Sequence, residues 1–194
     1  MDILSHGLWA ALSARAVNKK LAARDKLPRR LDVNLAFLWG ILPDLIPFTP
    51  IFILVFYGLL HGQMFPFRPA QTGSLEGLGT PVPFILELTK QIYSFTHSFI
   101  IFFICFFMGW AFRRFVTPRG RGLAALPFEM GGWFLHILVD IPTHAADFYP
   151  TPFIWPLSNY HVSGVPWASP VVYIPNLIGL AVFYWWIKRR PRTS

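Results

Sequence analysis

Four long apolar segments dominate the sequence, and a lipid bilayer limits what such segments can fold into. They are Val33–Leu60, Ile92–Phe112, Leu123–Ile141 and Val171–Ile187. Because hydrocarbon offers no partners for backbone polar groups, a spanning segment must form a helix or join a closed barrel, and roughly 20 residues suffice for a helix. Only 13% of the residues are charged, whereas a soluble domain carries roughly 25%. We therefore expect an all-α, polytopic membrane helix bundle.

The expected bundle has about four transmembrane segments plus a short N-terminal helix within Met1–Ala14, all in a single membrane-embedded domain over residues 1–194. Pro43, Pro47 and Pro50 interrupt the first long segment, and Asp44 lies among them. Proline frees backbone carbonyls that lipid cannot satisfy, so this stretch should face protein or water. We expect a broken span here.

Basic residues indicate the orientation of the chain. Of the 17 Lys and Arg residues, all but Arg68 and Lys90 fall within residues 15–30, 113–121 and 188–192. Clusters of this kind flank membrane segments on the cytoplasmic side. Loops 61–91 and 142–170 are then extracytoplasmic. Membrane orientation also accounts for the net charge of +8, so no nucleic-acid partner is expected.

Ionisable residues inside the apolar segments are the unusual feature. Such residues are costly in hydrocarbon and mark functional sites. They are His6, Asp44, His97, Glu129, His136 and Asp140. His136 and Asp140 are four residues apart, so on a helix they share one face and can hold a metal ion or form a simple hydrogen-bonded pair. The single cysteine, Cys105, excludes an internal disulfide and a cysteine-based zinc site.

The depth of these residues favours a shared site. Counted from the nearest basic cluster at 1.5 Å per residue, four of the segments bring a ligand-type residue to about 20–24 Å above the cytoplasmic boundary. The residues at this level are His6, Asp44, His97 and His136. Each histidine alone is more often a packing residue. Two buried carboxylates with no basic side chain at their depth need a cation, and a divalent metal would supply it.

Other ionisable residues lie in or near these segments. We expect Pro142 to end the helix near Ile141, so that His144 folds back over the site as a general base. Asp147 could orient a ligand histidine. Glu129 lies roughly 10 Å deeper, where a structural or proton-handling role is favoured over ligation. His61 and His161 lie in loops and are not expected to be ligands.

The ordered ligand residues carry a family resemblance. The order resembles that of the membrane-bound metal-dependent hydrolases, also described as LexA-binding, inner-membrane-associated hydrolases, and the closing segment Phe153–Ser158 resembles theirs. The ligand order is also similar to the helical core of zinc-dependent phospholipase C. The motifs are Ser5-His6-Gly7, Leu42-Pro43-Asp44, Thr96-His97-Ser98 and His136-x-x-x-Asp140.

The resemblance implies a multi-pass protein of a bacterial inner membrane whose site faces the extracytoplasmic side. It implies a hydrolase that cleaves a phosphoester or ester of a lipid or lipid-linked substrate through a metal-activated water. Asp44, Asp140 and His144 are the expected catalytic residues. One or two divalent ions, with zinc expected, suit this chain better than three, because no His-x-x-x-Glu pair follows Asp140. The implied metal ligands are His6, Asp44, His97, His136 and Asp140.

Two other classes of function remain open from the residues alone. The chain could be a catalytically silent, metal-binding membrane scaffold or regulator. It could also be an ion-coupled transporter with a relay of buried His and Asp residues. Transporters usually show repeated segments with paired broken helices, and this sequence shows no internal repeat. The transporter is therefore the least favoured.

Overall fold

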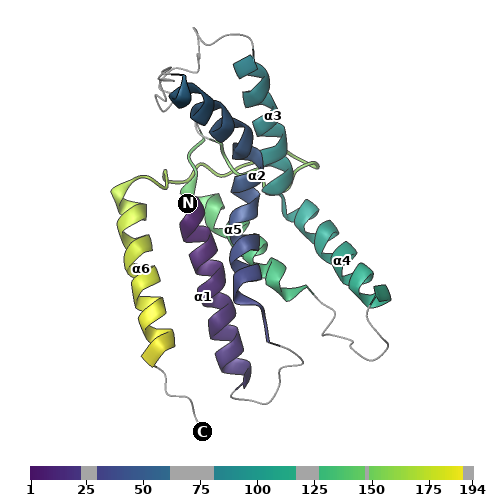
Figure 1. The fold of residues 1–194 in the computed structure, drawn as a ribbon, viewed down its shortest axis with the longest axis vertical. Helices are drawn as coiled ribbons and strands as arrows, with labels where there is room; N and C mark the ends of the chain where they lie inside the picture. Colours follow the sequence, from purple (N-terminus) through teal and green to yellow (C-terminus); the bar gives the residue numbers. More distant parts are fainter. Residues whose placement is uncertain (23–29, 62–80, 117–126, 147–148, 190–194) are drawn as a thin grey trace.

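The computed structural model describes residues 1–22, 30–61, 81–116, 127–146 and 149–189, and within these ranges it contains only helices (Figure 1). The predicted all-α membrane bundle is confirmed. The elements are α1 (Ile3–Ala22), α2 (Val33–Leu60), α3 (Pro81–Thr96), α4 (Phe99–Val116), the short 3-10 helix η2 (Phe128–Met130), α5 (Gly131–Thr143) and α6 (Pro170–Arg189).

The described helices include two that are long and apolar enough to cross a membrane, α2 and α6. The pair α3 and α4 also meets this test together, but with a bend of 62° between the two helices. At 13 residues, α5 is shorter than the roughly 20 that a straight span needs, so the predicted segment Leu123–Ile141 is not one long helix. Its residues 123–126 lie outside the described part. The N-terminal helix, at 20 residues, is longer than the short one expected.

Helix α2 begins at a side-chain cap and continues through its prolines. The Asp32 carboxylate accepts the backbone N–H groups of Asn34 and Leu35 at 2.9 and 3.0 Å, which satisfies donors that a helix start leaves free. Pro47 has no N–H to donate to the carbonyl of Pro43, four residues earlier. The Thr96 hydroxyl donates to that carbonyl at 2.8 Å instead. The predicted break is thus a continuous helix, which changes direction partway along its length (Figure 1).

The segment predicted as the span Ile92–Phe112 is not one uninterrupted helix, because it is broken at His97 and Ser98 between α3 and α4. The Ser98 hydroxyl oxygen accepts the N–H groups of Ile100 and Ile101 at 3.1 and 3.3 Å and starts α4 as a cap. The same hydroxyl donates to the carbonyl of Trp155 in the loop before α6. This break leaves His97 between two helices, at the interior of the bundle.

Helices α1, α2 and α5 approach one another backbone to backbone. A Cβ atom placed on Gly40 of α2 would lie 2.8 Å from the carbonyl oxygen of His6 in α1. One placed on Gly132 of α5 would lie 2.4 Å from the carbonyl oxygen of Ala36 in α2. Both distances are shorter than any normal carbon contact. Only glycine at these positions permits the packing that brings the predicted ligand residues together.

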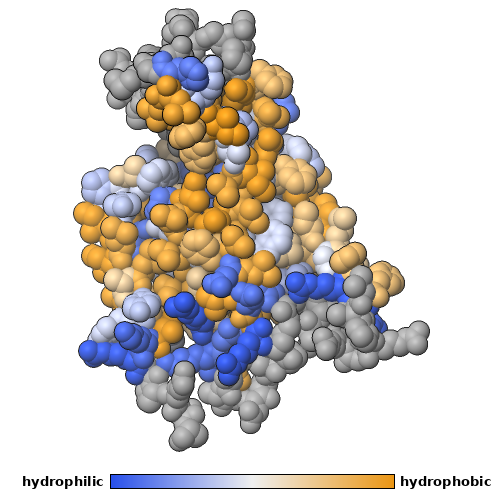
Figure 2. Space-filling view, viewed as in Figure 1, coloured by the Kyte–Doolittle hydropathy of each residue, from blue (hydrophilic) through white to orange (hydrophobic). Residues whose placement is uncertain are grey.

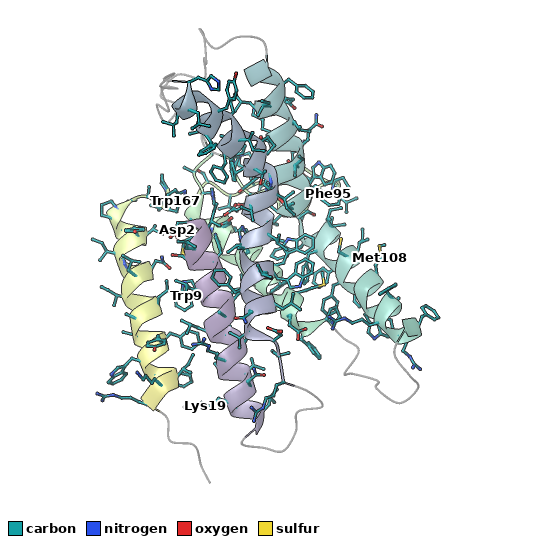
Figure 3. The ribbon with its side chains drawn as sticks, viewed as in Figure 1. Asp2, Trp9, Lys19, Phe95, Met108 and Trp167 are labelled. Atoms are coloured by element: carbon teal, nitrogen blue, oxygen red, sulfur yellow. The ribbon has the colours of Figure 1, made fainter. Side chains whose placement is uncertain are left out.

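The surface of the bundle divides into an apolar belt and a basic end (Figure 2). Large side chains such as Phe52, Phe107 and Leu177 are about half exposed, as expected for residues that face lipid. The last turns of α1, α4 and α6 carry the basic pairs Lys19–Lys20, Arg113–Arg114 and Lys188–Arg189. Figure 3 shows Lys19 at the opposite end of α1 from Asp2, and Trp9 between α1 and α6. There the Trp9 indole N–H donates to the Asn176 side chain at 2.8 Å.

Candidate metal centre

The five predicted metal ligands come from four parts of the chain and lie together in the bundle interior. Their side chains are buried, with at most 4% of any of these residues exposed. Four of them could hold a single metal ion, because one ligand atom of each lies within 4.8 Å of those of the others. These four are His6, Asp44, His136 and Asp140, and the ring of His97 lies against them.

The Asp140 carboxylate is at the centre of the cluster and faces different nitrogens with each oxygen. Its Oδ1 atom lies 2.9 Å from His6 Nε2 and accepts the amino group of Met1 at 2.6 Å. Its Oδ2 atom lies 3.1 Å from His136 Nε2 and 3.3 Å from His97 Nε2. The sequence reasoning that no basic group reaches this depth considered side chains only and overlooked the Met1 amino group.

Asp44 completes the side of the cluster that α2 provides. Its Oδ1 atom lies 3.4 Å from His97 Nε2 and 3.6 Å from His136 Nε2. No lysine or arginine contact to this carboxylate occurs among the described residues. The negative charge of Asp44 is therefore balanced only by groups that share the cluster.

Backbone carbonyls orient two of the imidazoles. His97 Nδ1 lies 3.1 Å from the carbonyl oxygen of Tyr93, and His136 Nδ1 lies 2.7 Å from that of Gly40. A carbonyl oxygen only accepts, so each Nδ1 must carry the hydrogen. In this tautomer each Nε2 has a lone pair, and the two Nε2 atoms lie only 3.0 Å apart. Two lone pairs at that distance repel, and either a shared proton or a bound metal ion between the nitrogens would remove the repulsion.

Two polar atoms of the cluster have no hydrogen-bond partner among the described residues. They are His6 Nε2 and Asp140 Oδ2, whose contacts of 2.9 Å with Asp140 Oδ1 and 3.1 Å with His136 Nε2 do not have hydrogen-bond geometry. Both are fully buried, and a buried polar atom without a partner costs roughly 1–3 kcal/mol. A metal ion would remove that cost, since neutral imidazole and carboxylate are its common ligands. The donor set therefore fits a divalent ion bound by nitrogen and oxygen.

His144 reaches the edge of the cluster. Its Nδ1 atom lies 3.5 Å from Asp140 Oδ1 and 3.3 Å from the Asp140 carbonyl oxygen. Burial lowers the pKa of His144 below its ordinary value. The helix runs through Pro142 to Thr143, slightly past the predicted end near Ile141, and His144 is its C-cap. The chain beyond is fixed by the N–H of Gly164, which donates to the His144 carbonyl at 2.8 Å.

The other ionisable residues considered in the sequence are not part of the ligand cluster in the described structure. Glu129 is buried at the start of α5, where its Oε1 atom accepts the N–H of Asp32 at 3.2 Å and its Oε2 atom lies 3.9 Å from Arg113 Nη1. His61 is exposed at the end of α2, and His161 is exposed in the loop before α6. Asp147 lies outside the described residues.

The sequence reasoning missed Tyr93, which is 2% exposed and packs against the cluster. Its ring stacks on the His97 imidazole with centroids 3.6 Å apart. The spacing of four residues between them on one helix was a signal that could have indicated this contact. No sequence signal indicates the carbonyl of Gly40, because its contact with His136 depends on how α2 and α5 pack.

Comparison with known proteins identifies the family of the chain. No curated protein and no solved structure matches it. The family model described as YdjM inner membrane protein matches residues 1–193, which is nearly the whole chain. This match agrees with the apolar helices and with the resemblance seen in the ordered motifs. The chain belongs to the YdjM inner membrane protein family.

Proposed function

We propose that this protein is a membrane-embedded, metal-dependent hydrolase that acts on a phosphoester or ester of a lipid or lipid-linked substrate. The observation that carries the proposal is the approach of His97 Nε2 and His136 Nε2 to 3.0 Å. Both Nδ1 atoms face backbone carbonyls, and two carboxylates lie within 3.6 Å of these nitrogens. A divalent ion bound by these nitrogens and carboxylates would remove the repulsion between the two lone pairs.

The donor atoms could hold one or two ions, with zinc the expected metal. On one side of Asp140, Oδ2 lies near His97 and His136, and Asp44 lies beside the same two nitrogens. On the other side, Oδ1 lies near His6 and His144. A carboxylate that offers one oxygen to each group of nitrogens suits a bridging ligand. A single ion would use the four residues that lie closest together.

A divalent ion bound here would lower the pKa of a bound water toward neutrality and polarise an ester or phosphoryl oxygen. Asp44 and Asp140 supply the negative charge that holds the ion. Burial of the cluster excludes bulk water, which strengthens each electrostatic contact. His144, 6% exposed at the rim, is placed to pass a proton between the cluster and the loop side.

The substrate proposal rests on the surroundings of the cluster and on the ligand order, which is similar to that of zinc-dependent phospholipase C. The cluster is enclosed by helices whose outer faces carry exposed apolar side chains such as Phe52, Ile53 and Phe56 of α2. A substrate that reaches it through the apolar belt would be a lipid. The site faces the extracytoplasmic side in this proposal, because the basic last turns of α1, α4 and α6 mark the opposite end (Figure 2).

Hydrolysis by the purified full chain in lipid nanodiscs tests the activity. Phospholipids, a soluble phosphodiester and a carboxyl ester are offered with zinc or with a chelator, and products are measured by mass spectrometry. We expect turnover with zinc, loss of turnover with chelator, and no turnover by Asp140→Asn. His161→Ala is the matched control, because His161 is exposed and should leave turnover unchanged. Bound metal without turnover of any ester would overturn the hydrolase and favour a silent scaffold.

Orientation has its own test. A reporter fused after Ser194 should give a cytoplasmic signal, since Lys188 and Arg189 end α6 and basic residues stay on the cytoplasmic side. A periplasmic signal at this position would place the cluster toward the cytoplasm and contradict the proposed access from outside.

A further inference from the structure

The described residues contain two tyrosine–histidine pairs with the same spacing and similar local geometry. In α3, the rings of Tyr93 and His97 stack with centroids 3.6 Å apart and planes at 20°. At the end of α2, the rings of Tyr57 and His61 stack at 4.1 Å and 29°. In both pairs the histidine Nδ1 faces the tyrosine carbonyl oxygen, at 3.1 and 2.9 Å. The local turn alone therefore accounts for the stack and for the tautomer.

Their surroundings differ. Tyr57 is 55% exposed, and His61 lies outside the ligand cluster. Tyr93 is 2% exposed, and the ring that it stacks on carries a nitrogen 3.3 Å from Asp140. A buried ring pressed against one face of an imidazole limits rotation about the histidine side-chain bonds. Tyr93 thus restrains the direction of His97 Nε2.

Tyr93 also contacts the loop that precedes α6. Its hydroxyl lies 3.4 Å from the hydroxyl of Thr151, which is 2% exposed. Its ring packs against Tyr149, with centroids 5.4 Å apart, and meets the His144 ring edge-on at 6.3 Å. One side chain therefore touches a predicted ligand, the residue at the rim and the loop.

The backbone at Tyr149 supports a fixed arrangement of this loop. Its φ of 43° lies in the left-handed region, which is strained for a bulky residue and persists only when the surroundings hold it. The Tyr149 ring packs on Phe48, at 5.2 Å, as well as on Tyr93. Contacts with α2 and α3 thus hold the strained residue in place.

We propose that Tyr93 is a positioning residue that fixes the His97 imidazole toward the metal and ties this ligand to the loop at residues 149–151. The inference rests on the proposed metal site. The Tyr93 ring fixes the imidazole by stacking on it, and the Tyr93 hydroxyl contacts the loop through Thr151. Neighbouring groups that orient a ligand histidine typically contribute about 10–100-fold to metal affinity.

The test compares Tyr93→Leu, Tyr93→Phe and the matched control Tyr57→Leu in the purified full chain. Zn²⁺ affinity is measured by competition with a chromophoric chelator, and bound Co²⁺ reports ligand geometry through its visible absorption spectrum. We expect Tyr93→Leu to lose about 10–100-fold in affinity and to change the Co²⁺ spectrum. Tyr57→Leu should change neither. Tyr93→Phe should keep the affinity and the spectrum, since the ring stack remains, but should raise amide hydrogen exchange at residues 149–153.

The outcomes separate this inference from the proposed function. Wild-type protein that binds neither ion overturns the metal site. In that case the side-chain motion of His97, measured by NMR relaxation without metal, still tests the positioning role, because loss of the stacked ring in Tyr93→Leu should increase this motion. Wild-type affinity and spectrum in Tyr93→Leu, or equal losses in Tyr93→Leu and Tyr57→Leu, would overturn the role of Tyr93. If Tyr93→Leu does not fold, Thr151→Val and Tyr93→Phe decide through hydrogen exchange: unchanged exchange at residues 149–153 in both contradicts the tie to the loop.

Discussion

The buried carboxylate of Glu129 and the buried pair Asp44 and Asp140 lie in different parts of the bundle, and their negative charges have different partners. Glu129, 1% exposed, receives the N–H of Asp32 at 3.2 Å and lies 3.9 Å from an arginine. Asp44 and Asp140 face mainly imidazole nitrogens. A backbone donor and an arginine suffice for a structural contact. With neutral imidazoles, the Met1 amino group is one positive charge beside two carboxylates, so the cluster can accept a further cation, and this difference separates a metal centre from a helix connection.

The largest predicted effect is that of Asp140→Ala. This change removes the carboxylate that faces His6, His136 and the Met1 amino group, and it leaves the buried positive charge of Met1 without its carboxylate partner. Breaking a buried charge pair costs about 3–5 kcal/mol, so the free energy of unfolding in detergent should fall by that amount. A loss under about 1 kcal/mol, the range of an exposed ion pair, would mean that Asp140 is not the centre of the cluster.

Removal of the metal should have the next largest effect on stability. A ligand that binds only the folded state stabilises it by about 2.7 kcal/mol at 100 times its Kd. Zinc should therefore raise the melting temperature of the wild type and of Glu129→Gln, and a chelator should reverse the rise. His136→Ala should show no such response. An equal response in His136→Ala would show that zinc binds elsewhere.

A substitution at Gly132, the glycine of α5 that contacts α2, tests whether close helix packing is needed for zinc binding. In Gly132→Ala the new methyl meets the Ala36 carbonyl, whereas around Gly131 nothing lies within 4 Å. We expect Gly132→Ala to lose about 1–3 kcal/mol, as overpacked sites do, and to bind zinc more weakly. Gly131→Ala is the matched control. Equal effects of the two changes would contradict close packing as the cause.

The smallest effect should come from Glu129→Gln. The amide oxygen can still accept the Asp32 N–H, while the weak contact with the partly exposed Arg113 is lost. We expect a loss of about 1 kcal/mol in chemical unfolding, with zinc affinity unchanged. Lower zinc affinity in this variant would connect the two carboxylate groups and contradict their separate roles.

Much of the fold followed from the sequence because lipid restricts spanning segments to few structures. Apolar length predicted helices, and depth counting predicted one level for residues from separate segments, where the structure places His6, Asp44, His97 and His136. Depth is a single coordinate, however. It does not give the rotation of a helix about its axis, which determines whether a side chain faces lipid or the interior.

The remainder depended on contacts between distant segments. The break at His97 follows from the capping by Ser98 and its bond to Trp155, far along the chain. The continuity of α2 through Pro47 depends on a hydroxyl from Thr96. A count of basic side chains could not include the Met1 amino group, and the orientation of His136 requires the Gly40 carbonyl. Each of these is a contact between residues far apart in the chain, and no local sequence pattern predicts it.

Elemental analysis of the purified chain tests the central claim most directly. Wild type, Glu129→Gln and the double variant His136→Ala/Asp140→Asn are purified in parallel without added metal, and divalent ions are measured by mass spectrometry. A metal centre predicts a stoichiometric divalent ion, with zinc expected, in the wild type and in Glu129→Gln, and its loss in the double variant. Equal metal content in all three proteins would contradict the claim that these buried histidines and aspartates form a metal centre.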